Sequence, residues 1–300
     1  MSNPIFNSNP AFSARGPVVQ RATPQYGRSG QSGQYGQYGQ YGAAGAATAD
    51  AGALEQMYTA PSATTRDTSR MTYDDVIVKT AGLLAVLVTA AAITWFVAPQ
   101  LFWVGMIVGL ILGLVNAFKR EPSPVLIFAY AVAEGVFLGG ISYILQETLG
   151  SRPGEDLAVQ PIVLQALLAT GATFLAALFL FRSGRVRVTP KSVRWLLVAM
   201  VGYGVFSLVN VGLMWFGGMD GWGLRSEVSV LGIPLGVIIG IAAVGMAAFS
   251  LIVDFDSIKR GVERGVPARY AWSAAFGLVV TLVWLYLEFL RILAILRGNN

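Results

Sequence analysis

The chain has 300 residues, of which 55% are hydrophobic and 12% charged, and its mean hydropathy is +0.60, so it has far less polar surface than a soluble domain, in which about 25% of residues are charged. It contains no cysteine and no histidine, which excludes disulfides, thiolate nucleophiles, iron–sulfur clusters, the usual zinc sites and a Ser-His-Asp triad. The net charge of +5 comes mainly from short loops between apolar runs, a pattern of membrane topology and not of nucleic-acid binding.

Residues 1–70 differ in composition from everything that follows. They are rich in Gly, Ser, Gln, Ala and Tyr, and they contain the near-repeat GQSGQYGQYGQYGAAG from Gly30 to Gly45. Such a segment buries too little apolar surface to offset its ordering entropy, so we expect a disordered tail. It lacks the basic start and apolar core of a signal peptide. Its spaced tyrosines also allow a weak self-association motif, but the composition favours a solvated tail.

From residue 71 to residue 300 the chain consists mainly of long apolar runs. Asp74 and Asp75 precede the first run and mark a helix start, because carboxylates stabilise a helix N-terminus. The runs cover residues 78–98, 101–118, 124–145, 159–181, 193–216, 231–253 and 270–295. Each is near the roughly 20 residues that a helix needs to cross the hydrocarbon core. The sequence therefore predicts an all-α membrane protein with seven transmembrane helices, the first two joined by a tight hairpin at Pro99 and Gln100.

The basic residues in the loops predict the orientation of the helices. The loops after the second, fourth and sixth runs contain eleven Lys and Arg residues, whereas the alternate loops contain two, Arg152 and Arg225. The positive-inside rule predicts a cytoplasmic N-terminus and a C-terminus on the far side of the plasma membrane. Arg291 and Arg297 near the C-terminus oppose an outside C-terminus, because basic residues favour the cytoplasmic side. A re-entrant or incomplete last helix would return the C-terminus to the cytoplasm.

Glycines spaced four apart predict close helix packing, because residues four apart share one face of a helix. Such series occur in the second, third and sixth runs: Gly105, Gly109 and Gly113; Gly135 and Gly139; Gly232, Gly236 and Gly240. We therefore expect a compact bundle in which these three helices pack tightly.

Four carboxylates in or beside the apolar runs are the candidate functional groups, because burying a charge in a membrane is unfavourable. Glu134 lies near the middle of the third run, Asp254 and Asp256 end the sixth, and Glu288 lies within the seventh. Asp256 fits a simple interfacial pair with Arg260, and Glu288 fits either a local pair with Arg291 or a carboxylate turned into the bundle. Glu134 is equally consistent with a functional group and with a neutral side chain hydrogen-bonded to another helix.

The end of the chain resembles the Bax inhibitor-1 (YccA-like) family. The resemblance rests on Asp254-x-x-x-Ile258-Lys259 followed by a basic loop, on the segment Leu-Tyr-Leu-Glu-Phe at residues 285–289, and on Glu134-Gly135 in the third run. It covers about residues 75–297 and leaves the tail outside. The long tail, Ala271-Trp272 and the segment at residues 284–288 look like the actinobacterial branch. It implies that Asp254 and Glu288 form a carboxylate pair, although Glu288 replaces an aspartate and the 34-residue spacing is long.

The resemblance implies a pH-sensitive calcium leak, with calcium as the transported ion, no resident cofactor, and Asp254 and Glu288 as its tentative ligands. Two carboxylates held close share a proton, and when deprotonated they offer the oxygen ligands that Ca²⁺ prefers. Asp256 and Arg291 are supporting candidates, and Glu134 is a third gating carboxylate. The alternative is a non-conducting modulator that binds a membrane protease or another membrane complex. An intramembrane hydrolase ranks last, so we expect no enzyme activity.

Overall fold

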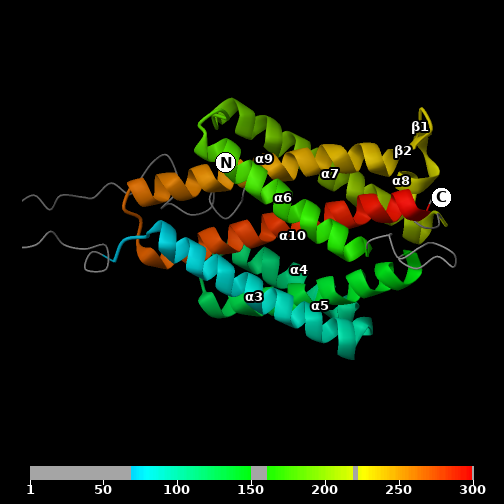
Figure 1. The fold of residues 1–300 in the computed structure, drawn as a ribbon, viewed down its shortest axis with the longest axis horizontal. Coiled ribbons are helices and arrows are strands. Elements are labelled where there is room, and N and C mark those ends of the chain that lie inside the picture. Colours follow the sequence, from blue (N-terminus) through cyan, green and yellow to red (C-terminus); the bar gives the residue numbers. More distant parts are fainter. Residues whose placement is uncertain (1–68, 150–160, 219–221, 299–300) are drawn as a thin grey trace, which may run out of the picture. The chain divides into compact units, whose positions relative to one another are not determined.

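A computed structural model describes residues 69–149, 161–218 and 222–298, and seven helices in these ranges are long and apolar enough to cross a membrane (Figure 1). They are α3 (Tyr73–Val97), α4 (Phe102–Phe118), α5 (Pro124–Leu149), α6 (Ile162–Arg182), α7 (Pro190–Phe216), α9 (Leu235–Glu263) and α10 (Ala271–Gly298). The predicted seven-helix membrane bundle is therefore confirmed. Of the predicted tail, all but the last two residues lie outside the described ranges.

Local capping explains where two of the helices begin and end. At the start of α3, Thr72 Oγ1 accepts from the backbone N–H of Asp75 and Asp75 Oδ2 accepts from that of Thr72, both at 3.1 Å, which forms a capping box. At the end of α9, Gly265 takes φ +64° and its N–H donates to Val262, while the next N–H donates back to Gly261. This Schellman arrangement turns the chain directly into α10.

Two predicted boundaries are wrong. The sixth helix was expected to end at residue 253, but α9 continues to Glu263, because its polar last turns still form backbone hydrogen bonds and contact α10. The same helix was expected to begin at residue 231, but residues 229–234 form a hairpin of β1 (Ser229–Val230) and β2 (Ile233–Pro234). Leu231 and Gly232 both have positive φ, as a two-residue hairpin loop requires.

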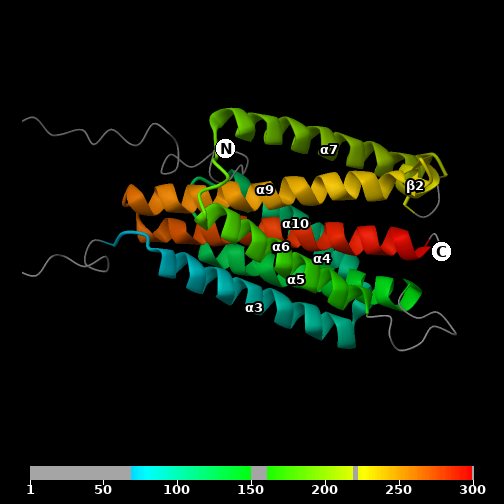
Figure 2. The same cartoon turned by 45° about the horizontal axis from the view of Figure 1, so that its top comes forward.

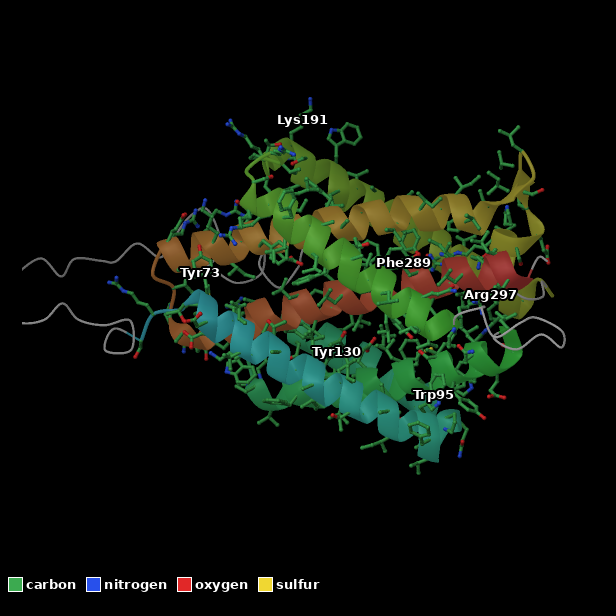
Figure 3. The ribbon with its side chains drawn as sticks, in the orientation of Figure 1. Tyr73, Trp95, Tyr130, Lys191, Phe289 and Arg297 are labelled. Carbon is green, nitrogen blue, oxygen red and sulfur yellow. The ribbon has the colours of Figure 1, made fainter. Side chains whose placement is uncertain are left out.

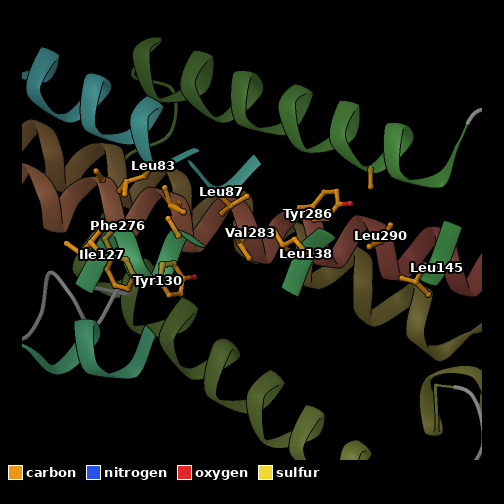
Figure 4. Close-up of a cluster of buried hydrophobic side chains, with 14 of the residues drawn as sticks. Leu83, Leu87, Ile127, Tyr130, Leu138, Leu145, Phe276, Val283, Tyr286 and Leu290 are labelled. Atoms are coloured by element: carbon orange, nitrogen blue, oxygen red, sulfur yellow. The ribbon is translucent and has the colours of Figure 1, made fainter. Parts of the chain in front are cut away.

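Helix α10 lies in the middle of the bundle, between α9 on one side and the α3–α5 pair on the other (Figures 1 and 2). Its buried face forms the main apolar core with residues of α3, α5 and α6, and this core follows α10 along most of its length (Figure 4). Helix α7 is the most peripheral helix: only Val193, Leu196 and Asn210 of it are buried, and its principal neighbour is α9. The polar groups of α10 are therefore the most deeply enclosed in this part of the chain.

The glycine series pack as predicted in α4 and α5 but differently in α9. A Cβ at Gly105 would lie 2.8 Å from the carbonyl oxygen of Ala133 in α5, and one at Gly139 would overlap Ala91 in α3. Both contacts require glycine, since they bring the backbones of neighbouring helices together. Gly236 and Gly240 contact Ile295 and Ile292 of α10, so the sixth helix also packs closely through its glycines, with the seventh helix as its neighbour.

The basic connections gather at one end of the bundle. Arg269 in the α9–α10 turn pairs with Glu121 in the α4–α5 loop at 3.5 Å, and the N–H of Met71 donates to the carbonyl oxygen of Val266 at 2.7 Å. Tyr73 near this end and Arg297 lie at opposite ends of the bundle (Figure 3). Helix α10 is one unbroken helix from Ala271 to Gly298. Which of its ends faces the cytoplasm stays a prediction.

Candidate functional site

Asp254 is completely buried between α9 and α10. Its side chain is 0% exposed, and its Oδ2 accepts a hydrogen bond from Thr281 Oγ1 of α10 at 2.8 Å. The hydroxyl of Thr281 also contacts the carbonyl oxygen of Gly277 at 3.1 Å, one turn earlier in α10. The carboxyl group therefore joins two neighbouring helices through a threonine that the sequence analysis had not singled out.

Glu288 lies in a second polar cluster, where α7, α8 (Leu224–Glu227) and α10 meet. Its side chain is 2% exposed and forms an ion pair with Arg291, three residues later in α10. Its Oε1 accepts hydrogen bonds from Trp284 Nε1 at 3.1 Å and from the hydroxyl of Tyr203 in α7. Both interpretations of Glu288 are therefore confirmed, because it pairs locally with Arg291 and also points into the bundle.

A second arginine, which is buried, completes this cluster. Arg225 of α8 is 5% exposed, and its Nη2 donates to Ser207 Oγ at 2.7 Å and lies 3.5 Å from the Tyr203 hydroxyl. Its guanidinium also lies 5.5 Å from the centre of the Tyr203 ring, and that of Arg291 lies 5.9 Å from it. We name Glu288, Arg291, Tyr203, Trp284, Arg225 and Ser207 the Glu288 centre. It contains two guanidinium groups and one carboxylate.

Asp254 and Glu288 do not occupy one level of the bundle. The partner of Asp254 on α10 is Thr281, which is seven residues from Glu288 and therefore about 10 Å from it along the helix axis. The 34-residue spacing explains the difference in level, because the turn at Pro267 is closer in sequence to Asp254 than to Glu288. Asp254 accepts from Thr281, whereas Glu288 accepts from Tyr203 and Trp284 and pairs with Arg291.

Glu134 lies in a third environment, between α4 and α5. Its side chain is 9% exposed, and its Oε2 occupies the space that a Cβ at Gly109 would need, 2.7 Å away. Within the described ranges it has no hydrogen bond or ion pair, in contrast to Asp254 and Glu288. It borders a cavity of about 360 Å³ whose walls come from α4, α5 and α10. The sequence had left its partner open, and no helix supplies one in this part of the chain.

Asp256, the fourth carboxylate, is partly exposed and has a local ion-pair partner. It forms an ion pair with Arg260, one turn later in α9, and its side chain is 22% exposed. This confirms the interpretation as an interfacial pair. The described residues contain no group of three or more carboxylates that could hold a metal ion.

Sequence reasoning missed Thr281, Tyr203 and Arg225. Thr281 did not stand out because a threonine in an apolar run often bonds the backbone of its own helix, and Tyr203 did not because an aromatic ring suits an apolar run. Arg225 had been counted as a loop charge on the far side, whereas it is buried and stacks on Tyr203. Its position three residues after the aromatic Trp222 in a short loop was the only signal.

The fold and these buried groups define a polytopic helical membrane protein with carboxylates at the contacts between helices. The family model described as Bax inhibitor 1 like matches residues 3–298, so the chain belongs to that family. The match includes the tail, which the resemblance had left outside. It does not distinguish branches of the family, so the assignment to the actinobacterial branch stays a prediction. No curated protein matches the chain.

Proposed function

We propose that this protein is a slow, pH-sensitive cation leak in the plasma membrane, with Ca²⁺ as the transported ion and buried carboxylates as the gate. One observation carries the proposal: two fully buried carboxylates hold contacts between helices, Asp254 between α9 and α10 and Glu288 between α10 and α7. A contact that depends on a charged carboxylate changes strength when that carboxylate takes up a proton.

The chemistry of the Glu288 centre gives the direction of the pH response. When Glu288 takes up a proton, its attraction to Arg291 is lost, and the guanidinium groups of the buried Arg225 and the partly buried Arg291 repel each other without compensation. This favours separation of α7 and α8 from α10. The proposed leak therefore increases as the pH falls, with Arg291 in a supporting role and Asp254 and Glu134 as further protonation-sensitive groups.

Ca²⁺ is the cargo in this proposal and not a resident ligand. Six to eight oxygen ligands are usual for Ca²⁺, and Asp254 and Glu288 belong to separate hydrogen-bonded sets. Each carboxylate therefore serves as a transient binding position along the path. The proposal includes no enzymatic reaction.

The test is Ca²⁺ flux into proteoliposomes between pH 5 and pH 8, with wild type, Asp254→Asn, Glu288→Gln and the matched control Asp74→Asn, which neutralises an exposed carboxylate at the start of α3. We expect pH-dependent flux in wild type and in the control, and flux that no longer follows pH in the other two. Monodisperse elution shows that each variant is folded. Absence of flux above empty liposomes from folded wild type would refute the leak.

A second candidate is a non-conducting modulator that binds a membrane protease or another membrane complex. The peripheral position of α7 favours it: Gly202, Gly204 and Gly212 have no atom within 4 Å of their Cβ positions. Open glycines allow a helix of another protein to approach closely. Gly204→Leu should then abolish association with a purified partner and leave Ca²⁺ flux unchanged, whereas the leak proposal requires no such partner.

A further inference from the structure

The cavity beside Glu134 has a composition unlike that of a metal site. Its volume is about 360 Å³, within the range of roughly 300–1,000 Å³ that is usual for small-molecule pockets. Three aromatic side chains line it, Tyr130 and Phe137 of α5 and Phe276 of α10. Among the described residues Glu134 is the only acidic or basic one that lines it, and apart from the Tyr130 hydroxyl the rest of the lining is apolar.

The carboxylate of Glu134 is directed toward this cavity and has no counter-charge among its walls. Gly109 of α4 leaves the space that its Oε2 occupies, and no lysine or arginine lines the cavity. An intramembrane carboxylate that is charged needs a cationic partner, and such residues serve elsewhere as counter-ions of ligands. A cation that enters the cavity would therefore meet a carboxyl group that has no Lys or Arg beside it among the described lining residues.

The lining favours an organic ammonium group over a metal ion. A Ca²⁺ ion requires six to eight oxygen ligands, whereas the cavity offers the Glu134 carboxylate and the hydroxyl of Tyr130. An ammonium group needs one carboxylate, and it is also attracted to aromatic faces. Tyr130 and Phe276 are in edge-to-face contact, with ring centroids 4.9 Å apart (Figure 4).

The position of the cavity defines how a ligand reaches it. Leu110 and Leu114 line it and are 64% and 51% exposed on the outer surface of α4. Glu134 is ten residues after the start of α5, about 15 Å along the helix axis, which is within the hydrocarbon region. Entry is therefore lateral, from the lipid, and the ligand must be apolar apart from its amine.

We propose that the cavity between α4, α5 and α10 binds a hydrophobic ammonium compound, such as an arylalkylamine, through Glu134 and its aromatic walls. This site goes beyond the proposed leak. Ligand binding to it is measured in an assay that does not depend on ion flux. A negative flux experiment would therefore not argue against the binding site, and a negative binding experiment would not argue against the leak.

The experiment is equilibrium dialysis of radiolabelled 4-phenylbutylamine against the full-length protein in lipid nanodiscs, with empty nanodiscs as the measure of partition into lipid. We expect saturable binding of one molecule per chain. Glu134→Gln should weaken it at least tenfold, whereas Glu147→Gln, which neutralises an exposed carboxylate of the same helix, should leave it unchanged. The neutral compound 4-phenylbutanol should not compete.

A second pair of variants tests the location. Gly113→Leu places a side chain in the cavity, and we expect it to weaken binding at least tenfold; Gly82→Leu, at an open position on α3, should have no effect. Equal binding to wild type and Glu134→Gln, or no saturable binding to folded wild type, would overturn the proposal. Equal competition by the alcohol would overturn the ammonium class, and full binding to Gly113→Leu would overturn the cavity as its place.

Discussion

Glu134 and Glu288 are the same residue type, both deeply buried in membrane-spanning helices, and their surroundings differ completely. Glu288 accepts from Tyr203 and Trp284 and pairs with Arg291, whereas Glu134 has no such partner in the described part of the chain and borders a cavity. Burial alone therefore does not define the role of an intramembrane carboxylate. The Glu288 centre holds helices together, and the Glu134 cavity has room for a ligand.

The largest effect is expected from breaking the ion pair in the Glu288 centre. Arg291→Met leaves a buried carboxylate without its counter-charge, so we expect a loss of about 3–5 kcal/mol in the free energy of unfolding. Unfolding in mixed micelles followed by tryptophan fluorescence measures it. The double variant Glu288→Met/Arg291→Met should recover most of the loss, and equal loss in single and double variants would contradict a coupled pair.

Asp254 gives the next largest effect. Thr281→Val removes the hydroxyl that donates to its carboxylate while keeping the shape of the side chain. We expect about 1–3 kcal/mol of destabilisation, because a buried acceptor loses a donor. Thr148→Val, at an exposed threonine of α5, is the matched control and should change stability little. Similar values for the two variants would mean that the Asp254 contact is unimportant.

The interfacial pair of Asp256 and Arg260 should matter less. Asp256→Asn is expected to lower stability by about 0.3–0.5 kcal/mol, as for other partly exposed pairs one helical turn apart. Salt should reduce the difference further, because exposed charges are screened. A loss of several kcal/mol that persists in high salt would indicate a more central role.

Glu134→Gln should have the smallest effect on stability. No hydrogen bond or ion pair of the described residues is lost, so we expect a change of less than about 1 kcal/mol in either direction. The same unfolding assay compares it directly with Arg291→Met. A loss as large as that of Arg291→Met would mean that Glu134 also holds helices together, and the contrast between the two glutamates would disappear.

Much of this arrangement follows from the sequence alone. Apolar runs of membrane-spanning length predicted all seven helices, and the one-turn spacings predicted the Asp256–Arg260 and Glu288–Arg291 pairs. Contacts between helices far apart in the chain were not predictable, since nothing local relates Tyr203 to Glu288 or Thr281 to Asp254. The β1–β2 hairpin was missed because its apolar residues continue the pattern of the following helix.

The central claim is that protonation of Glu288 loosens α7 from α10, and a distance measurement tests it most directly. The chain has no cysteine, so the substitutions Phe216→Cys and Leu296→Cys introduce the only two labelling sites. Both positions are exposed, near the ends of α7 and α10. Between pH 8 and pH 5 we expect the distance distribution to shift to longer values, and no pH dependence when Glu288→Gln is added. An unchanged distribution in the labelled protein with Glu288 present would contradict the account.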